Sequence, residues 1–222
     1  MRIVIFGGSG MVGQGVLREC LMAADVDEVV VVGRTALEVS HPKLKQVVTH
    51  DVTALSPHAV ILKETDACFF CLGVSSSGMN EQDYTRLTQT LTLDVASQLV
   101  ALSPQMTFIY VSGGGTDSTE HGRSMWARVK GRTENALLKL PFAHVCLFRP
   151  GVIQPLDGII SKTPSYRIFY RLLGPLLSVA RGVLPNQILT TRSVGRAMLN
   201  AVRQHKSGVL EAAQIAQLAS AN

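Results

Sequence analysis

Short apolar runs recur along the chain, and most of them end in glycine or in a small polar residue. Buried strands are predicted over residues 3–6, 28–32, 45–49, 67–73, 107–112 and 143–148. Between several of these runs the apolar positions follow a helical period, most clearly over residues 80–102 and 124–138. Continuous apolar strands that alternate with helices are typical of a parallel sheet covered on both faces. The pattern therefore predicts an α/β protein with a doubly wound parallel sheet.

The last third of the chain continues this pattern less regularly. Helices are predicted over residues 165–183 and 191–204, and an edge strand at residues 209–210. A length of 222 residues suits one α/β domain. We therefore expect residues 1–222 to form a single domain, in which residues 156–190 are a small, mostly helical insertion on the substrate side.

Composition and charge exclude several classes of protein. The net charge of +5 comes from scattered Lys and Arg residues without interleaved aromatic residues, so a nucleic-acid surface is not expected. The apolar stretch 169–184 is interrupted by arginines, a glycine and a proline, so it does not predict a membrane span. Glycines also interrupt the first apolar run, which we interpret as a strand and not as a signal peptide.

The four cysteines do not indicate a disulfide scaffold in a chain of this length. Cys68 and Cys71 have the spacing of a redox or zinc motif, but they lie in a predicted strand, where residues three apart point to opposite faces. Structural cysteines are therefore the preferred interpretation. No metal site is predicted, and we expect a cytoplasmic location.

The strongest candidate site follows the first strand. Gly7, Gly10 and Gly13 form a turn that leads directly into a helix, as in nucleotide-binding βαβ units. Small residues let the main chain approach a diphosphate, whose charge the helix N-terminus favours. The alternative is an ordinary tight turn. The residues predicted to bind the cofactor here are Gly7, Ser9, Gly10, Met11, Val12 and Gly13.

The residues after the second and third strands bear on the choice of cofactor. No acidic residue that could bind a ribose 2′-hydroxyl ends the second strand, whereas Arg34 follows it and suits a 2′-phosphate. NADP(H) is therefore preferred over NAD(H), although a plain surface arginine is the alternative. Asp51 and Val52 follow the third strand. Asp51 or Thr53 could cap the next helix, which is predicted to extend to residue 64.

Two further strand ends are predicted to face the same crevice. Leu72 and Gly73 end the fourth strand, beside the point where the strand order reverses. Ser112 ends the fifth strand and precedes glycines at residues 113–115. Such a glycine run is costly in conformational entropy, so it indicates either a loop that bends near a ligand or a flexible connection.

These motifs, in this order, carry a resemblance to a known class. The Gly7–Gly13 turn, Ser112, a Trp126-x-x-x-Lys130 pair and the sequence that begins at Arg149 and Pro150 resemble an atypical short-chain dehydrogenase/reductase, similar to the Tat-interacting-protein-like oxidoreductases and to the NAD-dependent epimerase/dehydratase superfamily. The resemblance covers residues 1–155. It implies a Rossmann fold, NAD(P) binding and hydride transfer. It also implies that Lys130, Asp51, Val52, Pro150, Gly151 and Val152 contact the cofactor.

One catalytic position departs from this pattern. In the family, a Lys lowers the pKa of a Tyr that exchanges a proton with the substrate, and a Ser polarises the substrate oxygen. Ser112 and Lys130 match two of these positions, but Trp126 occupies that of the Tyr, and an indole N–H cannot shuttle a proton at neutral pH. Trp126 either stacks on a flat ligand or fills the space of the phenol. His121, Tyr84 and Ser112 are candidate replacement acids.

Two functions therefore compete. The first is an NADP(H)-dependent oxidoreductase that acts on a small carbonyl-type substrate, with Ser112 and Lys130 as catalytic residues. The second is a catalytically impaired protein that senses NADP(H) and acts by regulation or interaction. A sugar-nucleotide epimerase is disfavoured because little chain follows Pro155. Helices of such folds often pair subunits, so a homodimer is an open expectation.

Overall fold

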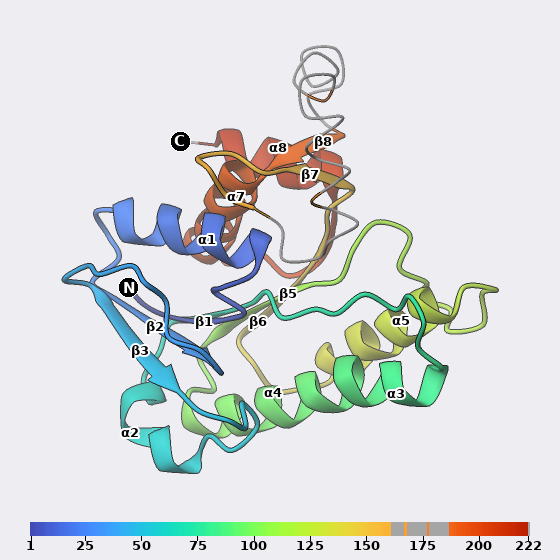
Figure 1. Ribbon diagram of the computed structural model, residues 1–222, viewed down its shortest axis with the longest axis horizontal. Helices are drawn as coiled ribbons and strands as arrows, with labels where there is room; N and C mark the ends of the chain where they lie inside the picture. The colour runs from blue at the N-terminus through green and yellow to red at the C-terminus, as the bar shows by residue number, and fades with distance from the viewer. Residues whose placement is uncertain (161–166, 168–176, 178–186, 222) are drawn as a thin grey trace.

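The computed structural model describes residues 1–160, 167, 177 and 187–221. Its centre is a seven-stranded sheet in the order β3-β2-β1-β4-β5-β6-β9, and every neighbouring pair is parallel (Figure 1). The strands are β1 (Arg2–Phe6), β2 (Glu28–Gly33), β3 (Leu44–Val48), β4 (Ala67–Phe70), β5 (Thr107–Val111), β6 (His144–Arg149) and β9 (Gly208–Glu211). The order reverses between β1 and β4, so the predicted doubly wound sheet is confirmed.

Helices cover both faces of this sheet. One face carries α1, α7 and α8, and the other carries α2 to α5 (Figure 1). The helices are α1 (Met11–Met22), α2 (Ala59–Leu62), α3 (Glu81–Thr85), α4 (Leu91–Leu102), α5 (Met125–Leu137), α7 (Thr191–Arg203) and α8 (Ala212–Ser220). Helix α8, which the sequence pattern did not predict, begins at a capping box between Glu211 and Gln214.

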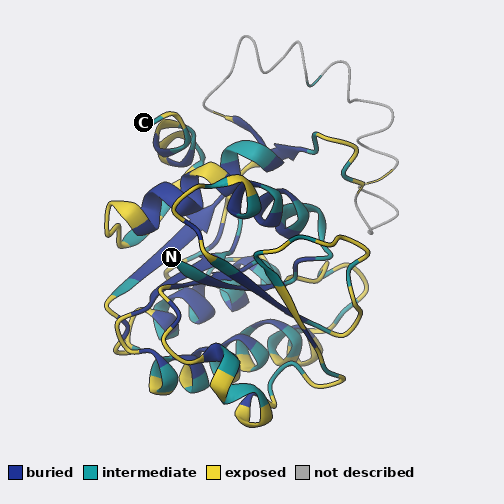
Figure 2. Cartoon of the chain, turned by 90° about the vertical axis from the view of Figure 1, so that its left-hand side faces the viewer, coloured by how far each residue is buried: buried dark blue, intermediate teal, exposed yellow. Residues whose placement is uncertain are grey.

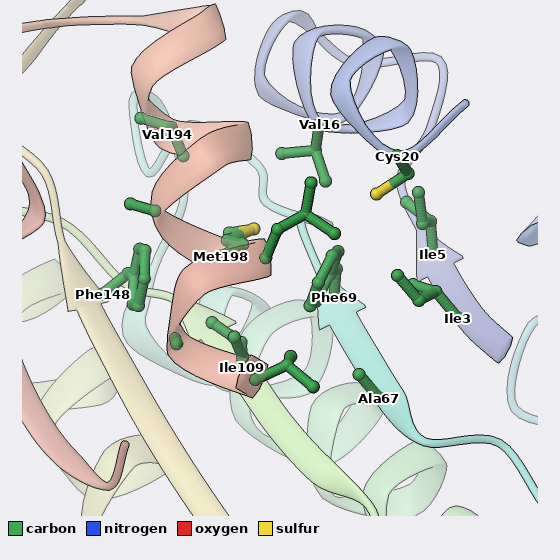
Figure 3. Packing of buried hydrophobic residues seen from close by; sticks show 14 of the residues in the cluster. Ile3, Ile5, Val16, Cys20, Ala67, Phe69, Ile109, Phe148, Val194 and Met198 are labelled. Carbon is green, nitrogen blue, oxygen red and sulfur yellow. The ribbon is translucent and has the colours of Figure 1, made fainter. Parts of the chain in front are cut away.

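Alternation along the strands divides the interior into two cores. In β1, Ile3 and Ile5 point to the face of α1 and α7, whereas Val4 and Phe6 point to the face of α4 and α5. Both sets are fully buried, and each belongs to a separate cluster of buried side chains. Figure 2 shows the central strands coloured mostly as buried. Figure 3 shows the first core, in which Met198 of α7 lies among side chains of the strands and of α1. The central strands are therefore apolar on both faces, as a buried parallel sheet requires.

The long helix predicted over residues 80–102 is present in three continuous parts. Helix α3 is followed by a π-helical segment, Arg86–Thr90, and then by α4. Asn80 caps α3, because its side chain accepts a hydrogen bond from the backbone N–H of Asp83 at 2.8 Å.

Other elements differ from the prediction. The helix expected to extend to residue 64 is only a 3₁₀ turn, Ser56–His58, joined to α2, and Asp51 does not cap it. Two short parallel strands, β7 (Val152–Gln154) and β8 (Ile188–Thr190), were not predicted. The helix predicted over residues 165–183 lies outside the described residues, apart from positions 167 and 177.

Candidate dinucleotide-binding and active site

The glycine turn after β1 leaves no room for side chains. Gly7 has φ +83°, which favours glycine, and a Cβ there would lie 2.8 Å from the backbone of both Cys71 and Leu72. A Cβ on Gly13 would lie 2.1 Å from the carbonyl oxygen of Gly7. The turn is closed by a hydrogen bond of 2.9 Å from the N–H of Gly10 to that same oxygen. Backbone contacts thus require glycine at the positions that the sequence motif marks.

The start of α1 offers backbone N–H groups to an anion. Gly10 is the N-cap and has no side chain that could accept from these donors, and the first turn contains no acidic residue. The positive end of the helix dipole lies at the same place. A cradle of this size and polarity fits the diphosphate of a dinucleotide.

Strand pairing brings the predicted residues after β4 to the same place. Phe6 pairs with Phe70, and the N–H of Cys71 donates to the carbonyl oxygen of Phe6 at 2.9 Å. Leu72 and Gly73 therefore follow β4 beside the glycine turn. A Cβ on Gly73 would meet no atom within 4 Å, so this position borders open space.

On the opposite side of the glycine turn, Arg34 follows β2. Its side chain is exposed and forms no hydrogen bond or ion pair with any described residue. Asp51, which follows β3, accepts from the N–H and hydroxyl of Thr53 at 2.9 and 2.6 Å, and these bonds lower the pKa of its carboxyl group. Asp51 thus stabilises a local turn, and it stays exposed beside Val52.

A cavity of about 660 Å³ lies next to this side, between α1 and the segment that joins β2 to β3. It begins at the glycine turn and is mostly apolar. Its lining includes Gly8, Ser9, Leu17, Leu21, Thr35 and Leu37. The cavity does not extend to Ser112 or Lys130, so it borders the adenosine side of the crevice and not the side where hydride transfer is expected.

Ser112 and Lys130 meet at the far end of the crevice. Ser112 is 3% exposed, and its hydroxyl donates to a carboxylate oxygen of Glu134 at 2.5 Å. The Lys130 ammonium donates to the backbone carbonyl of Ser112. Burial lowers the pKa of Lys130 to about 8, although the nearby carboxylate of Glu134 opposes this shift. Lys130 thus presents a charged donor, whereas the Ser112 hydroxyl is turned away.

The glycines that follow Ser112 lie against α5 and against the end of β6. A Cβ on Gly113 would be 3.8 Å from the Lys130 ammonium, and one on Gly115 would be 3.5 Å from the Trp126 ring. Both glycines have positive φ, +136° and +85°. The N–H of Gly114 donates to the carbonyl oxygen of Pro150 at 2.7 Å. The glycine run is therefore an ordered loop that follows the crevice wall.

The same contacts place the residues after β6. Pro150 is buried, whereas Gly151 and Val152 are exposed next to Gly114. These predicted cofactor contacts therefore lie beside the Ser112 end of the crevice. Their role in binding stays a prediction.

Two of the candidate replacement acids have positions that limit their use. Tyr84 is 2% exposed and packs in the core, and the Ser112 hydroxyl is bonded to Glu134. His121 is exposed in the loop between β5 and α5. Of the three candidate acids, His121 is therefore the one that is exposed.

Glu134 was missed by the sequence analysis, which named Arg149 only as the first residue after the strand predicted over residues 143–148 and not as a partner of Glu134. Glu134 is 1% exposed and pairs with Arg149, whose Nε lies 3.1 and 3.2 Å from its two oxygens. One signal was present: Glu134 comes seven residues after Ala127, on the buried stripe of α5. An acidic residue on such a stripe requires a buried cationic partner.

The fold and this geometry define a class of protein. Solved structures that share the fold include WbmH of Bordetella bronchiseptica in complex with NAD+ (TM-score 0.69, 14% identity, 95% of this chain and 74% of that one). A UDP-N-acetylglucosamine 4-epimerase of Bacillus cereus gives a TM-score of 0.66 at 14% identity and covers 95% and 77% of the two chains. The chain therefore has the Rossmann fold of NAD-dependent epimerases, dehydratases and short-chain dehydrogenases/reductases, which confirms the fold that the resemblance implied.

The chain is also similar, at low identity, to particular curated proteins. Protein HTATIP2 of Rattus norvegicus is 27% identical over 212 residues, 94% of this chain and 84% of its own length. Protein fmp52-2, mitochondrial, of Aspergillus terreus is 24% identical over 212 residues, 92% and 87% of the two chains. No protein-family profile matches the chain.

These relatives correct one prediction. The fungal FMP52 proteins that the chain resembles are named mitochondrial, which points away from a cytoplasmic location. The cytoplasmic prediction, which rested on the cysteines and on the first apolar run, is wrong, because neither pattern distinguishes compartments that keep thiols reduced. Among the described residues, no helix combines the length and apolar character needed to cross a membrane.

Proposed function

We propose that the protein is an NADP(H)-binding oxidoreductase that acts on a small carbonyl-type substrate. The observation that carries the proposal is the glycine turn, where backbone contacts leave no room for a Cβ at Gly7 or Gly13 and α1 offers uncapped N–H groups. Arg34 follows β2, is exposed and has no partner among the described residues, which supports a 2′-phosphate and thus NADP(H) over NAD(H).

We propose the following roles for the residues of the crevice. The turn from Gly7 to Gly13 holds the diphosphate, and Arg34 binds the 2′-phosphate. Lys130 donates to the hydroxyls of the nicotinamide ribose while the Ser112 carbonyl holds its ammonium. The bound dinucleotide supplies the hydride. Trp126 forms the wall beside Gly115, so that a flat group could stack on it.

The role that we propose for Ser112 differs from the catalytic role predicted from the sequence. To polarise a substrate oxygen, its hydroxyl would have to rotate away from Glu134 and break the 2.5 Å hydrogen bond. We propose that the carbonyl of Ser112 positions Lys130, and that its hydroxyl contacts substrate only if this rotation occurs.

A second function, a sensor of NADP(H) with impaired turnover, is favoured by one observation. The position of the usual proton donor holds Trp126, and the Ser112 hydroxyl is engaged elsewhere. Cofactor binding does not depend on either group, so it would survive a loss of turnover. The two functions share the dinucleotide site and differ only in whether substrate is converted.

The test is a fluorescence titration with NADPH and with NADH, because Trp126 is the only tryptophan. We expect quenching by NADPH at lower concentration than by NADH. Replacing Arg34 with Ala should weaken NADPH binding about tenfold and leave NADH binding unchanged, since one charge-assisted contact contributes about 1.5–3 kcal/mol.

Arg86→Ala is the matched control, because Arg86 is an exposed arginine whose only described ion pair is with Asp83 at 3.7 Å. It should bind both dinucleotides like the wild type. If the wild-type protein bound neither NADPH nor NADH, the proposal would be rejected. Binding without turnover across a broad panel of aldehydes and ketones would select the sensor.

A further inference from the structure

Glu134 is a carboxylate at the centre of a buried polar cluster. It is 1% exposed, although it lies on α5 among apolar side chains. Arg149 of β6 approaches it through Nε at 3.1 and 3.2 Å and also through Nη2. An isolated charge would be very costly at this depth, so each residue requires the other.

The cluster connects elements that surround the far end of the crevice. The Nη2 of Arg149 donates to the Ser118 hydroxyl at 2.5 Å, in the loop between β5 and α5. Its Nη1 donates to Glu211 at 3.3 Å, at the end of β9. The pair thus joins α5, β6, β9 and the loop that contains the glycine run. Loss of the Glu134–Arg149 pair would therefore alter the packing of the elements that form the crevice wall.

Two contacts link the cluster to the groups that face the crevice. The Ser112 hydroxyl donates to Glu134 at 2.5 Å, and the Lys130 ammonium donates to the Ser112 carbonyl. Lys130 also lies one helical turn before Glu134, so the two charged side chains share a face of α5. Glu134 therefore acts on Lys130 both through Ser112 and directly through its charge.

We propose that the Glu134–Arg149 pair is the positioning element of this site: it keeps the Ser112 hydroxyl turned inward and keeps Lys130 protonated and aimed at the cofactor ribose. The proposal rests on the proposed function for the identity of the ligand. Glu134 itself touches neither cofactor nor substrate; it acts through Lys130.

The charges around Glu134 give the sign of the expected effect. Its described ionisable neighbours are Lys130 on α5, Arg149 on β6 and Tyr110 on β5, and Glu211 of β9 faces Arg149 from the other side. Burial already lowers the pKa of Lys130 to about 8, and Glu134 raises it. Removing the negative charge would leave Arg149 with Glu211 as its one described ion-pair partner, so the pKa of Lys130 would fall further and its charge would be lost at lower pH.

The first experiment measures NADPH binding against pH through Trp126 fluorescence. In the wild type we expect affinity to fall as the pH rises through about 8, where Lys130 loses its charge. In Glu134→Gln this midpoint should move down by about one pH unit, the size of shift that one close charge produces. Glu134→Asp keeps the charge and should restore the wild-type midpoint. An unchanged midpoint in Glu134→Gln would overturn the proposal.

Glu81→Gln is the matched control, because Glu81 is the first residue of α3 and pairs with arginines of α5, the helix that carries Glu134. Glu81 pairs with Arg128 and Arg132 of α5 at 2.5 and 2.8 Å, yet it is partly exposed and lies outside the buried cluster. It should leave the midpoint unchanged. A shift as large as that of Glu134→Gln would attribute the effect to the general charge of α5 and would contradict a specific pair.

The second experiment needs no cofactor. Reactivity of each lysine toward acetic anhydride is measured over pH by peptide mass spectrometry, and the midpoint of Lys130 should lie lower in Glu134→Gln than in the wild type. If Glu134→Gln does not fold, the Lys130 midpoint is measured in the same way in Glu134→Asp and in Arg149→Lys.

These two variants keep both charges of the pair. The Lys130 midpoint should therefore stay near the wild-type value in each, and a fall in either variant would overturn the proposal. Failure of the wild type to bind NADPH would reject the proposed function, whereas an unshifted Lys130 midpoint in Glu134→Gln would reject the pair.

Discussion

The two ends of the crevice are built from different groups. At the end formed by β1 and α1, the groups that would meet a ligand are backbone amides, and Gly7 and Gly13 are there because the main chain touches itself. At the end formed by β5 and α5, the corresponding groups are side chains: the Lys130 ammonium donates to the backbone carbonyl of Ser112, and the Ser112 hydroxyl donates to Glu134. The first end depends on the absence of side chains, and the second depends on their identity.

This difference indicates which end of the crevice tolerates amino-acid substitutions. A backbone site fails if almost any side chain is added, so its motif has little freedom. A side-chain site can lose one member and keep the others, and the resemblance predicts this case, with Trp126 at the position expected to hold a Tyr. Lys130 keeps a use without that Tyr, because ribose binding requires only its charge and its donors. Binding and turnover can thus separate within one crevice.

The largest expected effect is at the side-chain end. Replacing Arg149 with Met should lower the free energy of unfolding by about 3–5 kcal/mol, because Glu134 would remain buried without its partner. Urea unfolding at neutral pH measures the change. Replacing both Glu134 and Arg149 with Met should recover part of the loss, since no unpaired charge then remains.

Arg203→Met is the control for this experiment. Arg203 pairs with Asp25 at 2.6 Å, but both side chains are more than a third exposed. Its loss should cost less than about 1 kcal/mol, as is usual for surface ion pairs. Equal losses of unfolding free energy for Arg149→Met and Arg203→Met would contradict a larger contribution of the buried pair to stability.

The next effect is at the backbone end. Gly13→Ala would place a Cβ 2.1 Å from the Gly7 oxygen, so the start of α1 must move away from the turn. We expect a loss of about 1–3 kcal/mol in unfolding free energy, the usual range for overpacking. We also expect NADPH to bind at least tenfold more weakly. Gly33→Ala is the control, since its Cβ would have its nearest neighbour at 3.9 Å. If Gly13→Ala bound NADPH as Gly33→Ala does, the cradle would not be the binding site.

The same contrast explains what could be predicted from the sequence. The strand over residues 3–6 and the glycines after it are a local pattern, and local backbone contacts determine the turn, so fold and cradle were both predictable. The orientation of the Ser112 hydroxyl depends on Glu134, 22 residues away, and Arg149 reaches Glu134 from a different strand. No periodicity or spacing contains that tertiary contact. The buried stripe of α5 could have indicated that Glu134 needs a cationic partner, but only the structure identifies that partner as Arg149.

A smaller effect is expected from restoring the missing donor. Trp126→Tyr places a phenol one helical turn from Lys130, whose positive charge would lower the pKa of the phenol. If the protein is a weak oxidoreductase, turnover of an accepted carbonyl should rise about tenfold, less than the roughly 10²–10⁴-fold usual for general acid catalysis because Ser112 stays turned inward. NADPH affinity should be unchanged, which isothermal calorimetry can measure without the tryptophan. A loss of NADPH affinity would show that Trp126 binds the cofactor itself.

The smallest expected effect concerns the pH dependence of stability. The pKa of Lys130 is lowered to about 8 in the folded protein, below the value near 10.5 of an exposed lysine. Between these two values the unfolded chain binds more protons than the native protein, so the contribution of Lys130 to stability rises with pH in that range. Below about pH 8 both states are protonated, and the contribution is constant.

The variant Lys130→Met isolates this contribution, because all other titrating groups are shared with the wild type. The difference in unfolding free energy, wild type minus variant, should therefore increase by about 1 kcal/mol between about pH 7 and about pH 9. Lys63→Met should show no such change, since Lys63 is exposed and its nearest described carboxylate is 4.0 Å away. A flat difference for Lys130→Met would mean that Lys130 titrates like a surface lysine. The far end of the crevice would then lack the desolvated charge that distinguishes it from the backbone cradle at the other end.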